Sequence, residues 1–142
     1  RFGIVVSEWN ESITLNLLEG AKQALLDNGV LEEHIVVRFV PGTFELPLGS
    51  QFFCEMTNVD GVIAIGVVIQ GETRHFDFVC EGATSGIKDV MLKYNKPVSY
   101  CVLTDNNIQQ SIDRSGGKHG NKGVECAIAC MKMIDLYRSF RK

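Results

Sequence analysis

The chain has 142 residues, of which 45% are hydrophobic and 22% are charged, a balance typical of a folded globular protein. The length predicts a single domain over residues 1–142, and the composition excludes a disordered chain. Seventeen acidic against fourteen basic residues give a net charge of −3, which disfavours a dedicated nucleic-acid binder. No apolar run approaches the roughly 18 residues of a membrane span, so we expect no membrane partner.

The chain alternates between short β-rich runs and longer runs with helical periodicity. The β-rich runs predict strands over residues 2–6, 35–40, 62–69 and 98–103. The helical runs predict helices from Asn10 to Gly29 and over residues 44–56, 73–94, 108–115 and 121–141. Asn10 is expected to cap the first helix with its side chain, Gly29 to end that helix, and Pro47 to lie in the first turn of the second.

This alternation predicts parallel strands joined by helical crossovers, and therefore a three-layer α/β sandwich. Ligands of such folds bind beyond the carboxyl ends of the strands. The segments in which chemistry is expected are therefore residues 7–10, 41–45, 66–75 and 104–107.

The five cysteines include no CxxC pair, and their odd number predicts reduced thiols and a cytosolic-type compartment. Cys126 and Cys130 lie four residues apart on a predicted helix, where a metal would need two more ligands and only His119 is near in sequence. We therefore expect both thiols to pack as small hydrophobic side chains, with no metal site.

The turn after the third predicted strand has the residues of a phosphate site. Gly71 lets the backbone turn sharply, and a helix that begins near Thr73 would direct free N–H groups and its positive dipole end at an anion. His75, in the first turn of that helix, has a side chain suited to moving protons near neutral pH. The alternatives are an ordinary turn capped by Thr73 and a structural histidine.

Two further strand ends and one helix end carry candidate binding residues. Glu45 lies in a loop stiffened by two prolines and can accept hydrogen bonds, or it can simply stabilise a helix start. Trp9, the only tryptophan, can stack on a planar heterocycle or pack on a neighbouring loop. Arg114, beside a glycine-rich break, can clamp a phosphate or remain a solvated surface residue.

Taken together, these segments resemble the lumazine synthase family over nearly the whole chain. The matching pieces are Trp9-Asn10, Pro41-Gly42-Thr43-Phe44-Glu45-Leu46-Pro47, Gly66 through Val79, Leu103-Thr104 with Asn107 and Gln110, Arg114 with Gly116, and Gly120-Asn121-Lys122-Gly123. The resemblance implies a flavodoxin-like three-layer α/β/α sandwich with a four-stranded parallel sheet.

The resemblance also implies an activity. The family joins 5-amino-6-(D-ribitylamino)uracil to 3,4-dihydroxy-2-butanone 4-phosphate and yields 6,7-dimethyl-8-ribityllumazine, phosphate and water, the penultimate step of riboflavin biosynthesis. No metal or organic cofactor is implied. The alternatives are a paralogue that binds flavin or lumazine without turnover, and a flavodoxin-like binding or signalling module.

Roles carry over residue by residue as what the resemblance implies. His75 is the expected catalytic residue, and Arg114 is expected to meet the Gly71–Thr73 turn. The pyrimidine and ribityl groups are expected at Trp9, Thr43, Phe44, Glu45, Val67, Val68, Ile69 and, from a neighbouring subunit, Tyr100. The phosphate is expected at the backbone of Glu72 and Thr73 and at the side chains of Arg114 and Lys122.

Three details depart from the family pattern: Gln70 replaces a basic residue common in the family, Glu72 adds a carboxylate to an anion site, and Ser99-Tyr100-Cys101 is more polar than the typical strand there. The family forms pentamers, and some members assemble twelve of them into a shell that encloses riboflavin synthase. A final helix that is apolar nearly all round predicts contact with another subunit, and the compact break between Gly116 and Gly120 favours the shell over the free pentamer. We expect a cytoplasmic location, with a plastid origin after transit-peptide removal as the alternative.

Overall fold

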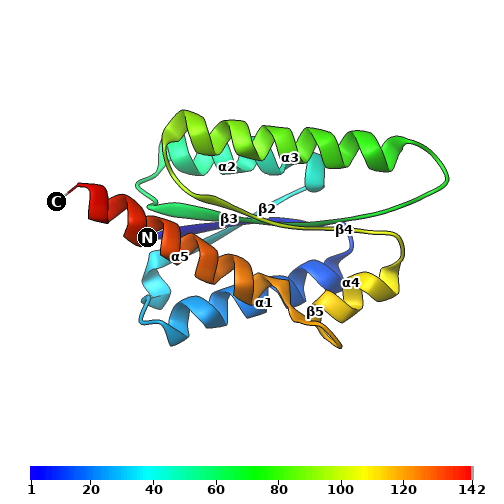
Figure 1. The fold of residues 1–142 in the computed structure, drawn as a ribbon, viewed down its shortest axis with the longest axis horizontal. Coiled ribbons are helices and arrows are strands. Elements are labelled where there is room, and N and C mark those ends of the chain that lie inside the picture. The colour runs from blue at the N-terminus through cyan, green and yellow to red at the C-terminus, as the bar shows by residue number, and fades with distance from the viewer. Residues whose placement is uncertain (142) are drawn as a thin grey trace.

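The computed structural model describes residues 1–141, which form a four-stranded parallel sheet between two layers of helices (Figure 1). The strands are β1 (Phe2–Ser7), β2 (Ile35–Val40), β3 (Gly61–Ile69) and β4 (Val98–Asp105), with a small antiparallel hairpin of β5 (Ser115–Gly117) and β6 (Gly120–Asn121). The helices are α1 (Glu11–Asp27), α2 (Leu46–Met56), α3 (His75–Tyr94), α4 (Ile108–Arg114) and α5 (Lys122–Phe140), with 3₁₀ turns η1 (Glu32–His34) and η2 (Thr43–Glu45).

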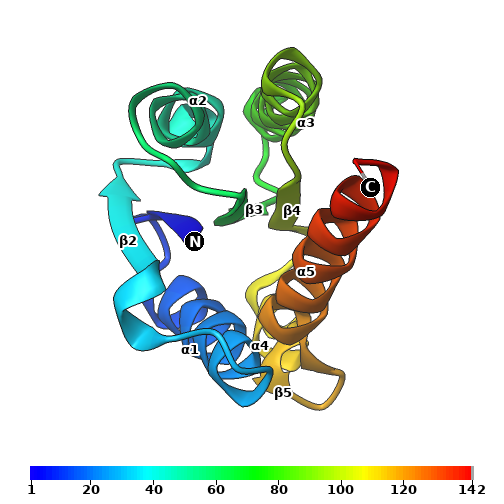
Figure 2. The same cartoon turned by 90° about the vertical axis from the view of Figure 1, so that its left-hand side faces the viewer.

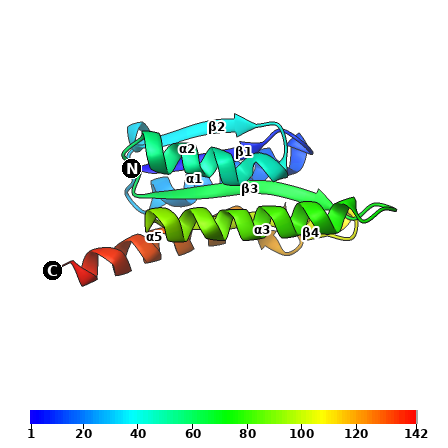
Figure 3. The ribbon, with the colours of Figure 1, turned by 90° about the horizontal axis from the view of Figure 1, so that it is seen from above.

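The strand order in the sheet is β2-β1-β3-β4, so the two central strands are the first and third in the chain. Helices α2 and α3 cover one face, and α1, α4 and α5 lie on the other, as the end-on view in Figure 2 shows. In Figure 3 the arrowheads of β2 and β3 point the same way, and the loop from β3 to α3 leaves at that end. The carboxyl ends of the strands therefore share one edge of the sheet.

The core consists of one apolar layer on each face of the sheet. Ile4 and Val6 of β1 join Ile63 and Ile65 of β3 in the layer against α1 and α5. The intervening residues of β3 belong to the layer against α2 and α3. This period of two on strands buried on both faces explains why β1 and β3 are apolar nearly without interruption.

The predicted fold is confirmed, and the strand and helix positions agree within about two residues except where noted below. Gly29 follows α1 with φ of 90°, and its N–H donates to the Leu26 carbonyl, as expected for a residue that ends a helix. Pro47 lies in the first turn of α2, where its missing N–H costs nothing. Cys126 and Cys130 are both buried in the core beneath α5, which confirms their packing as small hydrophobic side chains.

Two local predictions were wrong or incomplete. Asn10 does not cap α1 with its side chain: it adopts the left-handed conformation, and its backbone carbonyl accepts from the Ile13 N–H instead. Asparagine tolerates this conformation better than most residues, so the same residue type serves a turn rather than a cap. The predicted break between α4 and α5 is the β5–β6 hairpin. Its strands of three and two residues are too short to show an alternation of apolar and polar residues in the sequence. Among residues 1–141, no helix combines the length and apolar character needed to cross a membrane.

Candidate active site

The main cavity, of about 950 Å³, opens at the carboxyl ends of the strands. Four segments form it: the loop after β1, the loop and 3₁₀ turn after β2, the end of β3 with the start of α3, and the start of α4. The residues that line it are Trp9, Asn10, Pro41, Gly42, Thr43, Phe44, Glu45, Val67, Val68, Ile69, His75, Phe78, Val79 and Ile108. Eight of the predicted site residues thus meet in one cavity of a single chain.

Exposed aromatic side chains surround this cavity. Trp9 is 70% exposed and Phe44 is 59% exposed, although large apolar side chains normally seek burial. The Phe44 ring rests against α3 at Gly82, where an added Cβ would lie only 2.6 Å from the ring. The absence of a side chain at Gly82 therefore gives the Phe44 ring room to pack against α3. These aromatic faces are suited to a planar ligand.

Glu45 supplies the carboxylate of the main cavity. It ends η2, and its backbone N–H donates to the Gly42 carbonyl at 3.2 Å, which closes the turn. A Cβ on Gly42 would lie 3.3 Å from Glu45 Oε1, so this glycine leaves room for the carboxylate to fold back over the loop. The half-buried Glu45 is thus held on a stiff loop as an acceptor for hydroxyl or N–H groups.

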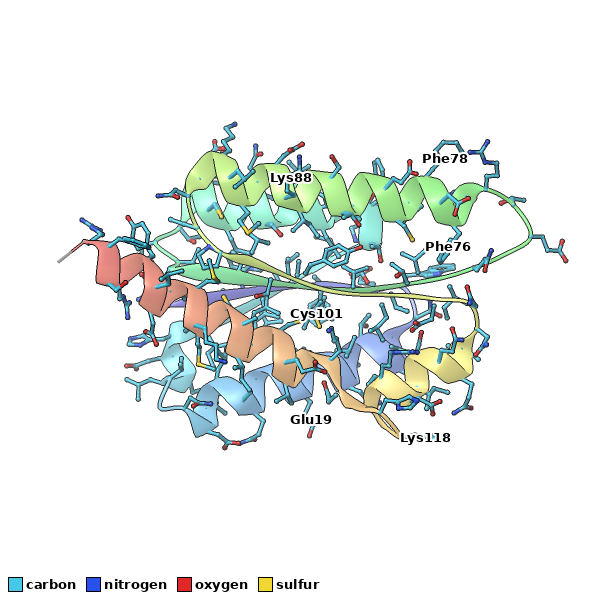
Figure 4. The ribbon with its side chains drawn as sticks, viewed as in Figure 1. Glu19, Phe76, Phe78, Lys88, Cys101 and Lys118 are labelled. Carbon is cyan, nitrogen blue, oxygen red and sulfur yellow. The ribbon has the colours of Figure 1, made fainter. Side chains whose placement is uncertain are left out.

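His75 is the first residue of α3 and the imidazole of the main cavity. Its backbone N–H donates to Thr73 Oγ1 at 3.3 Å, so Thr73 satisfies one free donor of the helix start, as its sequence position suggested. Glu72 and Thr73 lie in the exposed turn before α3 and do not line the main cavity. Figure 4 shows Phe76 pointing toward the sheet and Phe78 pointing away from it, as expected for two residues that lie two positions apart on a helix of 3.6 residues per turn.

Arg114 and Lys122 line a second, smaller cavity of about 300 Å³ beside β4. Arg114 Nη1 lies 3.4 Å from Asp105 Oδ1 and donates to the Gln110 carbonyl at 3.2 Å. Lys122 Nζ lies 3.7 Å from Glu125 Oε1. Within one chain, the structure therefore brings these two cations together but does not bring them into the cavity of His75.

Tyr100 lines neither cavity. It lies on the edge strand β4, half-buried against the α2–α3 layer, and its hydroxyl is 2.7 Å from Thr84 Oγ1. Burial raises the pKa of the Tyr100 phenol, so the side chain stays neutral over the physiological range. If Tyr100 contacts a ligand, it does so at this edge of the sheet and in a cavity of another copy of the chain.

Sequence reasoning did not single out Phe78, Val79 and Ile108 as site residues, although all three line the main cavity. Phe78 and Val79 follow His75 by three and four residues, so the helical period could have placed them on its face. Ile108 follows β4 and reaches the cavity only through the tertiary fold. Among residues 1–141, no group of three or more His, Cys, Asp or Glu side chains is arranged to hold a metal ion.

The main cavity combines aromatic faces, a carboxylate, an imidazole and the end of a strand. Its described lining residues include one carboxylate, Glu45, and one imidazole, His75, and neither Lys nor Arg is among them. Such a site can hold a planar, hydroxyl-bearing ligand and move protons. Cationic groups for a phosphate are present in the Arg114 cavity instead.

Comparison with known proteins gives a consistent result. The family model described as 6,7-dimethyl-8-ribityllumazine synthase matches residues 1–138. The protein of that name from Flavobacterium johnsoniae is 62% identical to this chain, over 94% of this chain and 70% of its own length. The one from Christiangramia forsetii is 58% identical, over 96% of this chain and 82% of its own length. The one from Bacteroides fragilis is 49% identical over all of this chain and 99% of its own length.

Proposed function

Because the chain belongs to the 6,7-dimethyl-8-ribityllumazine synthase family, we propose that it condenses 5-amino-6-(D-ribitylamino)uracil with 3,4-dihydroxy-2-butanone 4-phosphate. The products are 6,7-dimethyl-8-ribityllumazine, phosphate and water. The observation that carries this function is the convergence of Trp9, Glu45 and His75 on one cavity at the strand ends. The synthase names of relatives at 49% to 62% identity favour an enzyme over a non-catalytic binding paralogue.

The pyrimidine substrate is proposed to occupy the main cavity. Its ring stacks on Trp9, and its ribityl hydroxyls donate to Glu45 beside Phe44. The polar edge of the ring pairs with backbone groups of Val67 and Ile69 at the end of β3, and Val68 lies between them in the cavity wall. A ligand held at this many points loses much of its freedom before reaction, and such positioning supplies a large part of many rate enhancements.

His75 is proposed to move protons during the reaction. The primary amine of the pyrimidine attacks the ketone to form an imine with loss of one water. Elimination of phosphate and tautomerisation then leave a second carbonyl group, and the ribitylamino nitrogen attacks this carbonyl and closes the ring with loss of a second water. Each step transfers a proton, and an imidazole can both accept and donate one near neutral pH. His75 lies in the cavity wall next to the Glu72–Thr73 turn, whose N–H groups are proposed to hold the phosphate.

The cations for the phosphate are proposed to come from a second copy of the chain. Arg114 and Lys122 line the Arg114 cavity rather than the main cavity, and a guanidinium matches phosphate in shape and charge. If two copies meet so that the Arg114 cavity of one faces the main cavity of the other, the main cavity holds the pyrimidine and the facing cations hold the phosphate of the second substrate. Tyr100 lies on β4, the edge strand that also lines the Arg114 cavity, and it then closes the main cavity of the neighbouring copy.

Exposed apolar residues on two helices support this self-association. Leu48, Phe52 and Met56 of α2 are all more than half exposed and lie at intervals of four, so they share one face. On α5, Met133 is 51% exposed although its neighbours Cys130 and Ile134 are buried. Exposed apolar side chains gathered on one helix face are typical of an interface between subunits.

The proposed assembly is a pentamer, with twelve pentamers joined in a shell that can enclose riboflavin synthase. The short β5–β6 hairpin between α4 and α5 supports the shell over the free pentamer. The relatives reported above are bacterial, which supports a bacterial cytoplasmic location over the plastid alternative. In sedimentation, a pentamer of this 15.7 kDa chain runs at about 80 kDa and a shell near a megadalton.

A charge in the apolar face of α2 tests the shared site. Phe52→Glu is expected to dissociate the assembly and abolish turnover, whereas Leu31→Glu, at an equally exposed apolar position in a loop, is expected to do neither. A stable, active monomer would refute both the assembly and the shared site.

The activity itself is tested by mixing the two substrates with the purified protein. Lumazine fluorescence and phosphate release are expected to appear together and in equal amounts. Omission of either substrate is the control, and it should abolish both signals. Tight binding of lumazine without turnover would instead identify the non-catalytic paralogue.

A further inference from the structure

Strand β3 extends beyond the end of its neighbour β1. The pairing of these two strands ends at Val6 and Ile65, whereas β4 accompanies β3 as far as Ile69. Backbone groups of β3 that point toward the β1 side therefore have no strand partner beyond Ile65. This open stretch lies at the main cavity, because Val67 and Ile69 line it.

The direction of each backbone group on this stretch follows from the hydrogen bonds. The Gln70 N–H donates to the Asp105 carbonyl at 2.9 Å, so even-numbered residues of β3 direct their polar groups toward β4. Polar groups alternate in direction along a strand, so Val67 and Ile69 direct theirs to the open side. These two residues form the open edge of β3.

The side chain of Thr43 contacts this open edge. Its hydroxyl donates to the Val67 carbonyl at 3.2 Å, and Thr43 is only 5% exposed. The approach depends on Gly66, because a Cβ at that position would lie 2.7 Å from Thr43 Oγ1. The Thr43 hydroxyl thus joins the 3₁₀ turn after β2 to the end of β3, and the absence of a side chain at Gly66 makes room for it.

We infer that Thr43 is a positioning residue, which orients the Val67 carbonyl and so presents the open edge of β3 to the ring of the bound pyrimidine. The inference rests on the proposed function, and it differs from the direct contact to the ribityl chain expected from the sequence. A threonine hydroxyl has one hydrogen, and here Val67 already accepts it. The Thr43 side chain therefore cannot donate to a ligand hydroxyl without giving up the bond that holds the strand end.

Removal of this hydroxyl should weaken recognition of the ring. Thr43→Val keeps the shape and loses the donor, so the Val67 carbonyl is no longer oriented. A net hydrogen bond changes an equilibrium by about 3- to 10-fold, and we expect that factor in the dissociation constant of the pyrimidine. Thr43→Ser retains the donor and should restore binding. Ser7→Ala removes a nearby buried hydroxyl that has no hydrogen-bond partner among residues 1–141, so it serves as the matched control.

The experiment measures binding by calorimetry with two probes: the full pyrimidine substrate, and 5,6-diaminouracil, which has the ring without the ribityl chain. The inference predicts that Thr43→Val weakens both probes by the same factor. In steady-state kinetics it also predicts a raised KM for the pyrimidine and an unchanged KM for the butanone phosphate. Melting temperatures identify a variant that has simply lost its fold, and Thr43→Ala then replaces Thr43→Val.

Three outcomes overturn the inference: weakening of the ribityl-bearing probe alone, equal affinities of Thr43→Val and wild type for both probes, and loss of binding that Thr43→Ser does not restore. The proposed function fails separately. A wild-type protein that binds the pyrimidine but makes no lumazine refutes the activity, while the binding comparison still decides the role of Thr43.

Discussion

The guanidinium of Arg114 lies against the carboxylate of Asp105, with 3.4 Å between Nη1 and Oδ1. Asp105 is nearly buried, and its other oxygen accepts from the Ser111 hydroxyl at 2.7 Å. The carboxylate is therefore fixed, and it fixes one edge of the guanidinium in turn. The remaining N–H groups of Arg114, whose side chain is 42% exposed, stay available for an anion.

Arg114→Ala is expected to impair use of the butanone phosphate far more than binding of the pyrimidine. Loss of a charge-assisted hydrogen bond to phosphate costs roughly 1.5–3 kcal/mol. The measurement is KM for each substrate, and Arg114→Lys should recover only part of the loss because an ammonium cannot make the paired contact. Arg38→Ala, at an exposed arginine on β2, is the control. Equal losses for both substrates would indicate a general defect of the site instead.

His75→Ala is expected to slow turnover without abolishing it. General acid–base catalysis contributes about 10²–10⁴-fold, and we expect a loss below the upper end because positioning of the two substrates carries much of the rate. The check is single-turnover kinetics between pH 6 and 8, with His34→Ala in η1 as the control histidine. If the rates of His75→Ala match wild type at every pH, His75 has no part in proton transfer.

Gly66→Ala is expected to destabilise the fold. The new Cβ would lie 2.7 Å from Thr43 Oγ1 and 2.9 Å from Leu46 Cδ1, and overpacking of this kind costs about 1–3 kcal/mol. Gly71→Ala is the matched control, since a Cβ there would have no atom within 4 Å. Urea denaturation measures both free energies of unfolding, and similar losses in the two variants would contradict the packing argument.

Tyr94 is expected to ionise only in strong alkali. Its hydroxyl donates to Glu55 Oε2 at 2.6 Å, and this hydrogen bond, with a smaller contribution from burial, raises the pKa of the phenol to about 12 from an ordinary value of 10.0. The folded-state pKa exceeds the unfolded one, so the stabilisation is complete below pH 10 and is lost as the pH rises toward 12.

The test of Tyr94 is the difference in phenolate absorbance between wild type and Tyr94→Phe, recorded after rapid pH jumps. Its midpoint should lie well above pH 10 in the folded protein and near 10 in urea. Glu55→Ala should lower the folded midpoint. A folded midpoint near 10 in wild type would show that the Glu55 contact does not form in solution.

Much of the fold was predictable because burial leaves a period in the sequence. Strands buried on both faces must be apolar throughout, so β1 and β3 stood out, and Gly29 and Pro47 marked helix ends through their backbone chemistry. Asn10 was misjudged because a side-chain cap and a left-handed turn favour the same residue type. The β5–β6 hairpin escaped because strands of two or three residues carry no period.

The sequence by itself determined the parallel α/β architecture and the strand ends at which Trp9, Glu45 and His75 were sought, because residue periodicity and turn chemistry are local properties. Only the tertiary structure decided how these residues share space. It brought Trp9, Glu45 and His75 into one cavity, placed Arg114 and Lys122 in another, and directed the Thr43 hydroxyl to the Val67 carbonyl. Those relationships depend on strand order and on which face of the sheet each helix covers, and both are fixed by packing between segments distant in the chain.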